Sequence, residues 1–294
     1  MKVANKITKR GLFASAMLAG VLNTAAVQAA VTTIEGAAGG GIVPWALIHP
    51  GAPLVSYTNV KTNDFTVQSL ALGGTVAGRF ELSVAHQMLN APTVGGALGL
   101  DNRINQDVFG AKVKLVDMGK DSAMPQIAVG FQAKRASGAI LDALKKAGAI
   151  SDTSGIDWYG AATKVISMGG KSVLLNGTLR ATKANQFGLL GFGGGTLKDS
   201  NQYKIKPEVS AGVFLADNIV LGGEYRSKPN NISSAAFGIK EDGAWDIFMA
   251  YFVNKNMAIT AAYANLGQVG PSRTAVSTMS AKQDGSYLQL QVNF

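Results

Sequence analysis

The stretch Tyr287-Leu288-Gln289-Leu290-Gln291-Val292-Asn293-Phe294 carries the clearest structural signal in the chain. Leu288, Leu290, Val292 and Phe294 occupy every second position, and polar or amphipathic side chains occupy the positions between them. Successive side chains of a β-strand point to opposite faces, so this period of two predicts a strand with one apolar and one polar face.

The same period recurs upstream, in stretches spread along the whole chain. No run of about 20 apolar residues follows residue 30, so a membrane-spanning helix is not expected. A strand of a transmembrane barrel needs only about 9–11 residues, and polar residues facing the lumen dilute its apolar face. The pattern therefore predicts an all-β fold, an up-and-down antiparallel transmembrane barrel. The clearest repeats lie at residues 80–84, 109–115, 127–134, 173–180 and 219–226.

Connector lengths distinguish an outer-membrane barrel from a soluble one, because outer-membrane barrels alternate short periplasmic turns with longer extracellular loops. Five short and six long connectors predict 12 strands with both termini on the periplasmic side. The short ones lie near residues 73–77, 117–124, 168–171, 216–218 and 254–256, and the long ones near 49–64, 89–106, 136–156, 183–203, 228–243 and 267–285. Aromatic residues are expected at the lipid-facing strand ends, at Phe109, Tyr159, Tyr225, Trp245, Tyr251, Tyr263 and Phe294.

Residues 1–29 have the features of a secretory signal. Four basic residues precede the apolar run 11–22, and the small-residue site Val27-Gln28-Ala29 follows it. We expect cleavage near Ala29 and a barrel formed by residues 30–294. Loss of the four basic residues lowers the formal charge from +9 to +5, and nothing indicates a nucleic-acid partner.

Two segments leave alternatives open. The first strand is expected at residues 41–47, but Pro44 cannot donate a ladder hydrogen bond, so residues 30–47 are alternatively a plug folded into the lumen. Residues 137–148 show helical spacing of apolar side chains. That helix is either a surface cap or a constriction of the pore, and the cap is favoured.

The lumenal face concentrates the charged residues. Nine basic side chains against Glu81, Glu208, Glu224 and Asp246 leave a basic surplus of five, which predicts a preference for anions in an open pore. The alternative is an internal network of salt bridges that fills the barrel. The predicted lumenal basic residues are Arg79, Lys112, Lys114, Lys134, Lys164, Arg180, Lys204, Lys206 and Arg226.

Residues suited to catalysis or metal binding are scarce. The chain has no Cys, and its two His residues, His49 and His86, lie in different segments, so no metal site, cofactor or catalytic residue is predicted. Some 12-stranded barrels, such as the outer-membrane phospholipase, carry a lipid-facing Ser–His pair. A pairing of His86 with a serine on a neighbouring strand therefore stays a minor alternative.

Several stretches resemble a family of exported proteins of Gram-negative bacteria that is defined only as a domain of unknown function and regarded as outer-membrane barrels. They lie at residues 39–46, 157–164, 185–193, 223–229 and 245–248. This resemblance implies the fold and an outer-membrane location but no substrate. A strand ending in Phe294 also resembles the signal by which such barrels are recognised by the barrel-assembly machinery.

The sequence thus predicts an outer-membrane barrel that is a channel or transporter for small, preferably anionic, solutes and is not an enzyme. Its pore is expected to be lined by Glu208 and Glu224 together with the basic residues given above. Membrane lipid, the solute and the assembly machinery are the expected partners. The rival functions are a structural or assembly barrel with a plugged lumen and, less favoured, a lipid-acting enzyme.

Overall fold

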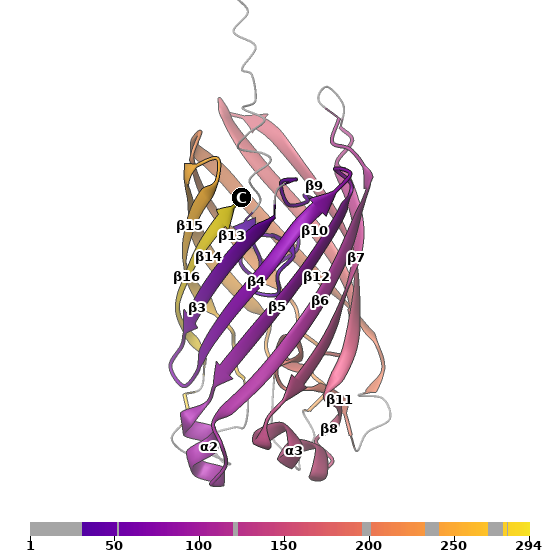
Figure 1. The fold of residues 1–294 in the computed structure, drawn as a ribbon, viewed down its shortest axis with the longest axis vertical. Helices are drawn as coiled ribbons and strands as arrows, with labels where there is room; N and C mark the ends of the chain where they lie inside the picture. Colours follow the sequence, from indigo (N-terminus) through magenta and orange to yellow (C-terminus); the bar gives the residue numbers. More distant parts are fainter. Residues whose placement is uncertain are drawn as a thin grey trace, which may run out of the picture.

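Twelve antiparallel strands close into a barrel in the computed structural model, which describes residues 31–51, 53–119, 123–195, 201–232, 241–269, 279–280 and 282–294. Each strand pairs with the next barrel strand along the chain, and β16 pairs with β3 to close the ring (Figure 1). The barrel strands are β3 (Leu54–Lys61), β4 (Thr66–Val76), β5 (Phe80–Asn90), β6 (Arg103–Val116), β7 (Gln126–Ser137), β9 (Ser154–Met168), β10 (Lys171–Thr182), β12 (Lys204–Ala216), β13 (Ile219–Arg226), β14 (Ala244–Asn254), β15 (Met257–Asn265) and β16 (Asp284–Asn293).

The two ends of the barrel differ in their connections. Short turns lie at the upper end in Figure 1, and the elaborate connections lie at the lower end. No helix in the described part of the chain is long and apolar enough to cross a membrane. The lower end carries α2 (Pro92–Leu98), α3 (Ala139–Lys146), η1 (Asn185–Gly188) and a small ribbon of β8 (Ile150–Asp152) and β11 (Phe192–Gly194).

The predicted strand number is confirmed, but the predicted first strand is wrong. Residues 41–47 lie inside the barrel, and the first wall strand is β3, in a segment predicted as a loop. The connection from β3 to β4 spans only residues 62–65, so the predicted alternation of loop lengths fails there. Pro44 has no amide hydrogen for a ladder, and the amides of Ile42, Val43 and Ala46 donate to the wall residues Glu224 and Thr163 instead.

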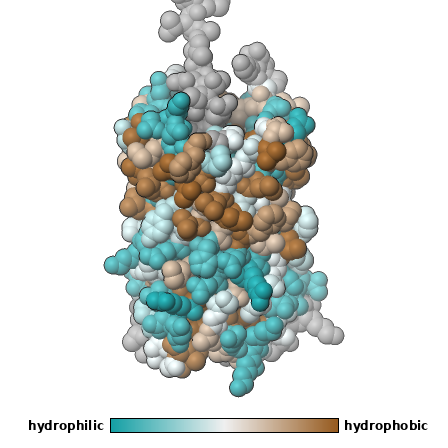
Figure 2. All heavy atoms as spheres, viewed as in Figure 1, coloured by the Kyte–Doolittle hydropathy of each residue, from teal (hydrophilic) through white to brown (hydrophobic). Residues whose placement is uncertain are grey.

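The outer surface changes character along the barrel axis. On the face seen in Figure 2, an apolar belt covers the half near the short turns, and the half near the long loops is mostly polar. The exposed side chains of Phe80, Leu82 and Val84 lie on the outward, apolar face of β5. An apolar outer band over a polar interior is the arrangement that lipid requires of a spanning barrel.

The predicted loop helix is present as α3, at the long-loop end. Its Ile140 and Leu141 side chains are buried, and the helix contacts β6, β7 and β8. It therefore packs on the rim of the barrel, in the position expected of a cap. The predicted signal, residues 1–29, lies outside the described residues.

Candidate functional site: the filled lumen

Residues 31–49, here called the N-terminal plug, fill the inside of the barrel. Every residue from 31 to 47 is buried, including the apolar Trp45. The plug folds back on itself through a ribbon of β1 (Val31–Thr32) and β2 (Ala38–Gly39). Of the two predicted alternatives for this segment, a wall strand and a plug, the structure shows the plug.

Polar side chains of the wall hold the plug backbone on many sides. Ser69 on β4 and Gln87 on β5 both donate to the Ile34 carbonyl, at 2.8 and 2.7 Å. Further hydrogen bonds of 2.7–2.8 Å come from Gln126 to the Ala46 carbonyl, from the Ala46 amide to Thr163, from Thr178 to the Pro44 carbonyl and from Gln289 to the Thr32 carbonyl. These bonds satisfy backbone groups that would otherwise be buried without a partner.

Glu35 anchors the plug to two separate strands of the wall, because its carboxylate bonds to a cation on each of them. It accepts a hydrogen bond from Lys134 on β7 and one of 2.6 Å from Arg226 on β13. Lys134 also contacts Asp157 on β9, with its Nζ 2.6 Å from Oδ2. All four side chains are at least 97% buried, so their charges interact with little screening by water.

Arg180 and Glu208 complete this cluster. Arg180 Nε lies 2.5 Å from Glu208 Oε1, and Arg226 Nε lies 3.2 Å from the same oxygen. The central cluster therefore joins three acids, Glu35, Asp157 and Glu208, to three bases, Lys134, Arg180 and Arg226. Equal numbers of opposite charges offset the large cost of burying each one.

A second anchor lies nearer the short-turn end. Glu81 accepts hydrogen bonds of 3.0 Å from the Ala38 and His49 amides, and Lys112 Nζ lies 3.2 Å from its Oε2. Lys112 also donates to three plug carbonyls, those of Ala38, Trp45 and Leu47. This pair therefore fixes both limbs of the plug at once.

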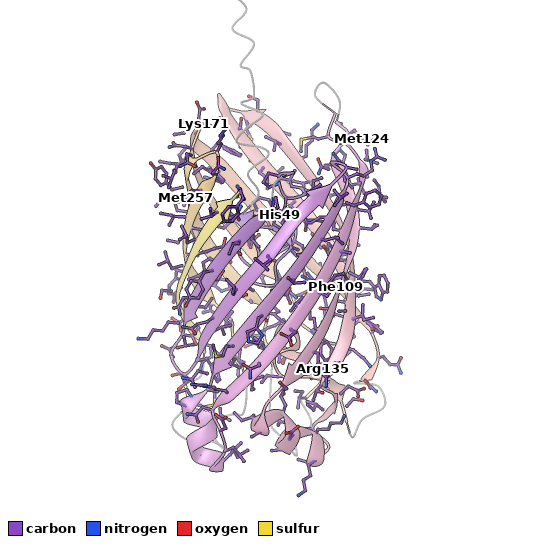
Figure 3. All side chains as sticks on the ribbon, viewed as in Figure 1. His49, Phe109, Met124, Arg135, Lys171 and Met257 are labelled. Carbon is purple, nitrogen blue, oxygen red and sulfur yellow. The ribbon has the colours of Figure 1, made fainter. Side chains whose placement is uncertain are left out.

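His49 ends the plug and is labelled in Figure 3 toward the short-turn end. Its Nε2 lies 3.0 Å from the Gly36 carbonyl oxygen, and its own carbonyl accepts from Thr75. Burial lowers the pKa of His49, and the nearby Glu81 carboxylate opposes that shift only partly. The imidazole is therefore neutral at neutral pH.

Glu224 and Asp246 form the acidic side of the lumen. Glu224 accepts from the Ile42 amide at 2.8 Å, from the Trp45 indole at 3.1 Å and from Ser210 at 2.7 Å. Asp246 lies directly opposite on β14, and its Oδ1 is buried without a hydrogen-bond partner among the described residues. No basic side chain in the described part of the chain forms a salt bridge with either carboxylate.

The plug approaches Glu224 so closely that only glycine fits at position 40. A Cβ atom on Gly40 would lie 2.0 Å from Glu224 Oε1, which is far inside van der Waals contact. The missing side chain lets the backbone pass directly over the carboxylate. Glycine is required at position 39 as well, because a Cβ atom there would lie 2.2 Å from the Val43 carbonyl oxygen.

A second segment enters the lumen from the long-loop end. Residues 184–194 are buried, and Phe187 adopts a left-handed backbone conformation with φ 63°. The Phe187 ring lies 4.0 Å from the Arg226 guanidinium carbon, and its carbonyl accepts from Lys134 at 3.1 Å. The plug and this inner loop thus meet at the same ionic cluster in the lumen.

Most predicted pore-lining residues do face the lumen. Lys112, Lys134, Arg180, Glu208, Glu224 and Arg226 are fully buried there, and Lys114, Lys204 and Lys206 share their parity but are half-buried toward the barrel ends. The buried wall holds four bases, Lys112, Lys134, Arg180 and Arg226, against five acids, Glu81, Asp157, Glu208, Glu224 and Asp246. The predicted basic surplus therefore does not extend to the buried wall, and lining of a conducting pore stays a prediction.

Three side chains lie elsewhere than predicted. Lys164 has the outward parity of β9 and donates to carbonyls of the β6–β7 turn, including that of Gly119 at 2.6 Å. Tyr159, expected on the lipid face, points inward and lies under Arg180. Arg79 lies in the β4–β5 turn with an exposed side chain near Asp117.

Two members of the central cluster were not predicted. Glu35 lies in a segment without strand periodicity, and no neighbouring motif indicated that it would enter the lumen. Asp157 begins the alternation that continues through Tyr159, and a correct parity for Tyr159 would have placed it inside. A charged residue at the start of a buried segment was the only available signal for Glu35.

The minor alternative of a Ser–His pair on the lipid face lacks its serine. The cross-strand neighbours of the exposed His86 are Leu70 and Asp107, and His86 Nδ1 lies 2.7 Å from Asp107 Oδ1. Among the described residues no group of three or more potential metal ligands was found.

A closed antiparallel barrel with an apolar outer belt and a charged interior defines an outer-membrane-type β-barrel protein. The chain belongs to the family described as "Protein of unknown function (DUF3034)", whose model matches residues 28–291. No curated protein matches the chain.

Several solved barrels are similar to the chain. The KdgM porin is 11% identical with a TM-score of 0.48, covering 82% of this chain and 99% of its own. The NanC porin is 8% identical with a TM-score of 0.49, covering 83% and 99%. Outer membrane phospholipase A from Escherichia coli is 10% identical with a TM-score of 0.38, covering 83% and 93%. Identities this low transfer no substrate and no activity.

Proposed function

We propose that the chain is a channel for small solutes in the Gram-negative outer membrane and that its own N-terminal plug closes it at rest. The observation that carries the proposal is the polar wall behind the plug. Residues 31–47 are held by hydrogen bonds and salt bridges from wall side chains such as Glu81, Lys112 and Glu224. When the plug leaves, water can replace each of those bonds.

The chemistry of the lumen favours a wall that becomes hydrated. In a permanently filled barrel, apolar residues of similar volume would often stabilise the core as well as or better than buried ion pairs. This lumen instead retains a six-residue ionic cluster centred on Glu35 and Arg226. Charged groups at these positions suit a barrel that alternates between a plugged and a water-filled state.

The anion preference belongs to this proposal and rests on the ends of the barrel. Lys114 lies near the short-turn end, and Lys204 and Lys206 lie at the long-loop end, all half-buried on the lumenal parity. Basic side chains at the ends of a pore attract anions, although Lys114 is paired with Asp117 and the buried wall between the ends is slightly acidic.

Membrane insertion is part of the same proposal. Phe294 is exposed at the end of β16, and its amide donates to the Pro53 carbonyl at 2.8 Å, beside the seam with β3. We expect the assembly machinery to recognise this strand and membrane lipid to surround the belt. The proposed activity is transport and includes no catalysis.

A second candidate is a structural barrel whose plug never leaves. The number of bonds between plug and wall, on β4, β5, β7, β9, β10 and β16, favours it. The two candidates differ in one observable property, which is ionic current.

The test is single-channel recording of the refolded chain in a planar bilayer under a salt gradient. We expect a closed resting state with brief openings, and a Glu35→Ala variant with many more openings of the same conductance. Asp142→Ala on the exposed face of α3 is the matched control and should behave as the parent. Silence of both the parent and Glu35→Ala, in barrels that have inserted, would favour the structural candidate.

A further inference from the structure

Three polar side chains lie in one row on the outer wall, away from the lumen. His86 on β5 is in register with Asp107 on β6, which is in register with Arg135 on β7. All three are exposed on the outward parity of their strands. His86 Nδ1 lies 2.7 Å from Asp107 Oδ1, and Nε2 of the imidazole takes no part in this contact.

An apolar groove adjoins this row. Its volume is about 570 Å³, and its lining combines the polar row with the apolar side chains of Leu70, Leu72, Val84, Phe109 and Ala133. Figure 3 shows Phe109 midway along the barrel and Arg135 closer to the long-loop end. In Figure 2 the surface changes over this part of the wall from the apolar belt to the polar half. The groove therefore runs from the hydrocarbon level to the level of the lipid headgroups.

We propose that this groove binds a lipid with a phosphate-bearing headgroup from the leaflet on the long-loop side. The apolar lining fits an acyl chain, and the planar guanidinium of Arg135 is matched to phosphate oxygens. No carboxylate among the described residues forms a salt bridge with Arg135, so its charge is available to a ligand. Asp107 holds the His86 ring in place beside the same headgroup, and the ring offers a second donor, at Nε2, in its doubly protonated form.

The chain offers a matched control for this site. Arg103 is an exposed arginine on the outward parity of β6, four positions from Asp107, and it is not part of the groove. Arg135→Ala and Arg103→Ala remove the same charge from the same face of the barrel. All these positions are exposed, so we expect each variant to fold, which heat-modifiable migration on a gel checks.

The experiment is native mass spectrometry of the full chain in an uncharged detergent with added lipid A. We expect adducts on the parent, at least a five-fold loss of bound lipid in Arg135→Ala, a smaller loss in His86→Ala and none in Arg103→Ala. Dephosphorylated lipid A should bind the parent no better than it binds Arg135→Ala. Equal losses in Arg103→Ala and Arg135→Ala, or equal binding of both lipids by the parent, would overturn the proposal.

Discussion

The carboxylate of Glu35 lies 2.6 Å from the guanidinium of Arg226, although 191 positions separate the two residues in the chain. The contact ties the plug to β13, while Lys134 ties the same carboxylate to β7, four strands further round the ring. One acidic residue of the plug thus pairs with two basic residues of the wall. Removal of that acid leaves both cations buried with fewer partners.

Loss of Glu35 should therefore release the plug. Breaking a buried ion pair from one side costs about 3–5 kcal/mol, so Glu35→Ala should lower the stability of plug docking by that order. Trp45 reports on docking once Trp158→Phe and Trp245→Phe remove the other two tryptophans. Urea titration of Trp45 fluorescence should show earlier exposure in Glu35→Ala, with Glu35→Gln between that variant and the parent. An unchanged midpoint would contradict this role.

Asp246 should have the opposite effect. Its carboxylate is buried opposite Glu224, and Oδ1 has no hydrogen-bond partner among the described residues. Asp246→Asn keeps the volume and replaces a buried acid that faces a second acid, so plug docking should strengthen by roughly 1–2 kcal/mol. Glu224→Gln should weaken docking, because Glu224 binds the Ile42 amide and the Trp45 indole. The same fluorescence titration measures both variants. Midpoints that shift in the same direction in Asp246→Asn and Glu224→Gln would contradict these opposite roles.

The long-loop end should respond to pH through Glu241. Burial raises the pKa of Glu241 from 4.5 to about 7, and the Lys228 ammonium only partly opposes that shift. Between pH 4.5 and pH 7, Glu241 binds more protons when its loop is docked on the barrel than when the loop is undocked. Docking of the loop that carries Glu241 should therefore weaken as pH rises from 4.5 to 7. Burial also lowers the pKa of Lys228, to about 8, so Lys228 stays protonated throughout that window.

Hydrogen exchange of residues 227–232 and 241–243 measures this effect. We expect faster local opening at pH 7 than at pH 5 once exchange rates are corrected for intrinsic chemistry. Glu241→Gln should remove most of the difference. A parent with equal protection at both pH values would contradict the assignment.

Ion selectivity should follow the end lysines. Replacing Lys114, Lys204 and Lys206 by Glu makes the charge of the open pore six units more negative. A change of this size is enough to reverse an anion preference. Reversal potentials under a salt gradient, recorded in the Glu35→Ala background, give the sign directly. Replacing the outward Lys164 by Glu is the control and should leave the potential unchanged. Unaltered selectivity in the triple variant would show that these three lysines do not set the ion preference of the pore.

The barrel was predictable because lipid and lumen impose opposite polarity on alternate residues. That constraint is strong in β16, where Leu288 and Leu290 face out and Gln289 and Gln291 face in. It is weak in β3, whose outward face includes Asn59 and Lys61 beyond the apolar belt. The apolar run at residues 41–47 was therefore the better match to a strand, although it lies in the lumen.

Errors within the site have a similar cause. Tyr159 and Lys164 were both assigned to the wrong face of β9, as expected from a one-residue shift of parity, which turns every side chain to the opposite face. Glu35 could not be placed at all, because its position depends on Lys134 and Arg226 and on no local pattern. Contacts between a plug and a wall are set by tertiary packing.

Reversible locking of the plug tests the central claim most directly. Ala46 of the plug packs in one small buried cluster with Ala128 of β7, and the chain has no other cysteine to interfere with a disulfide between cysteines placed there. In a planar bilayer, the oxidised Ala46→Cys, Ala128→Cys barrel should pass no current, and a reducing agent should restore openings in the same membrane. Equal current before and after reduction would contradict a plug that gates the channel.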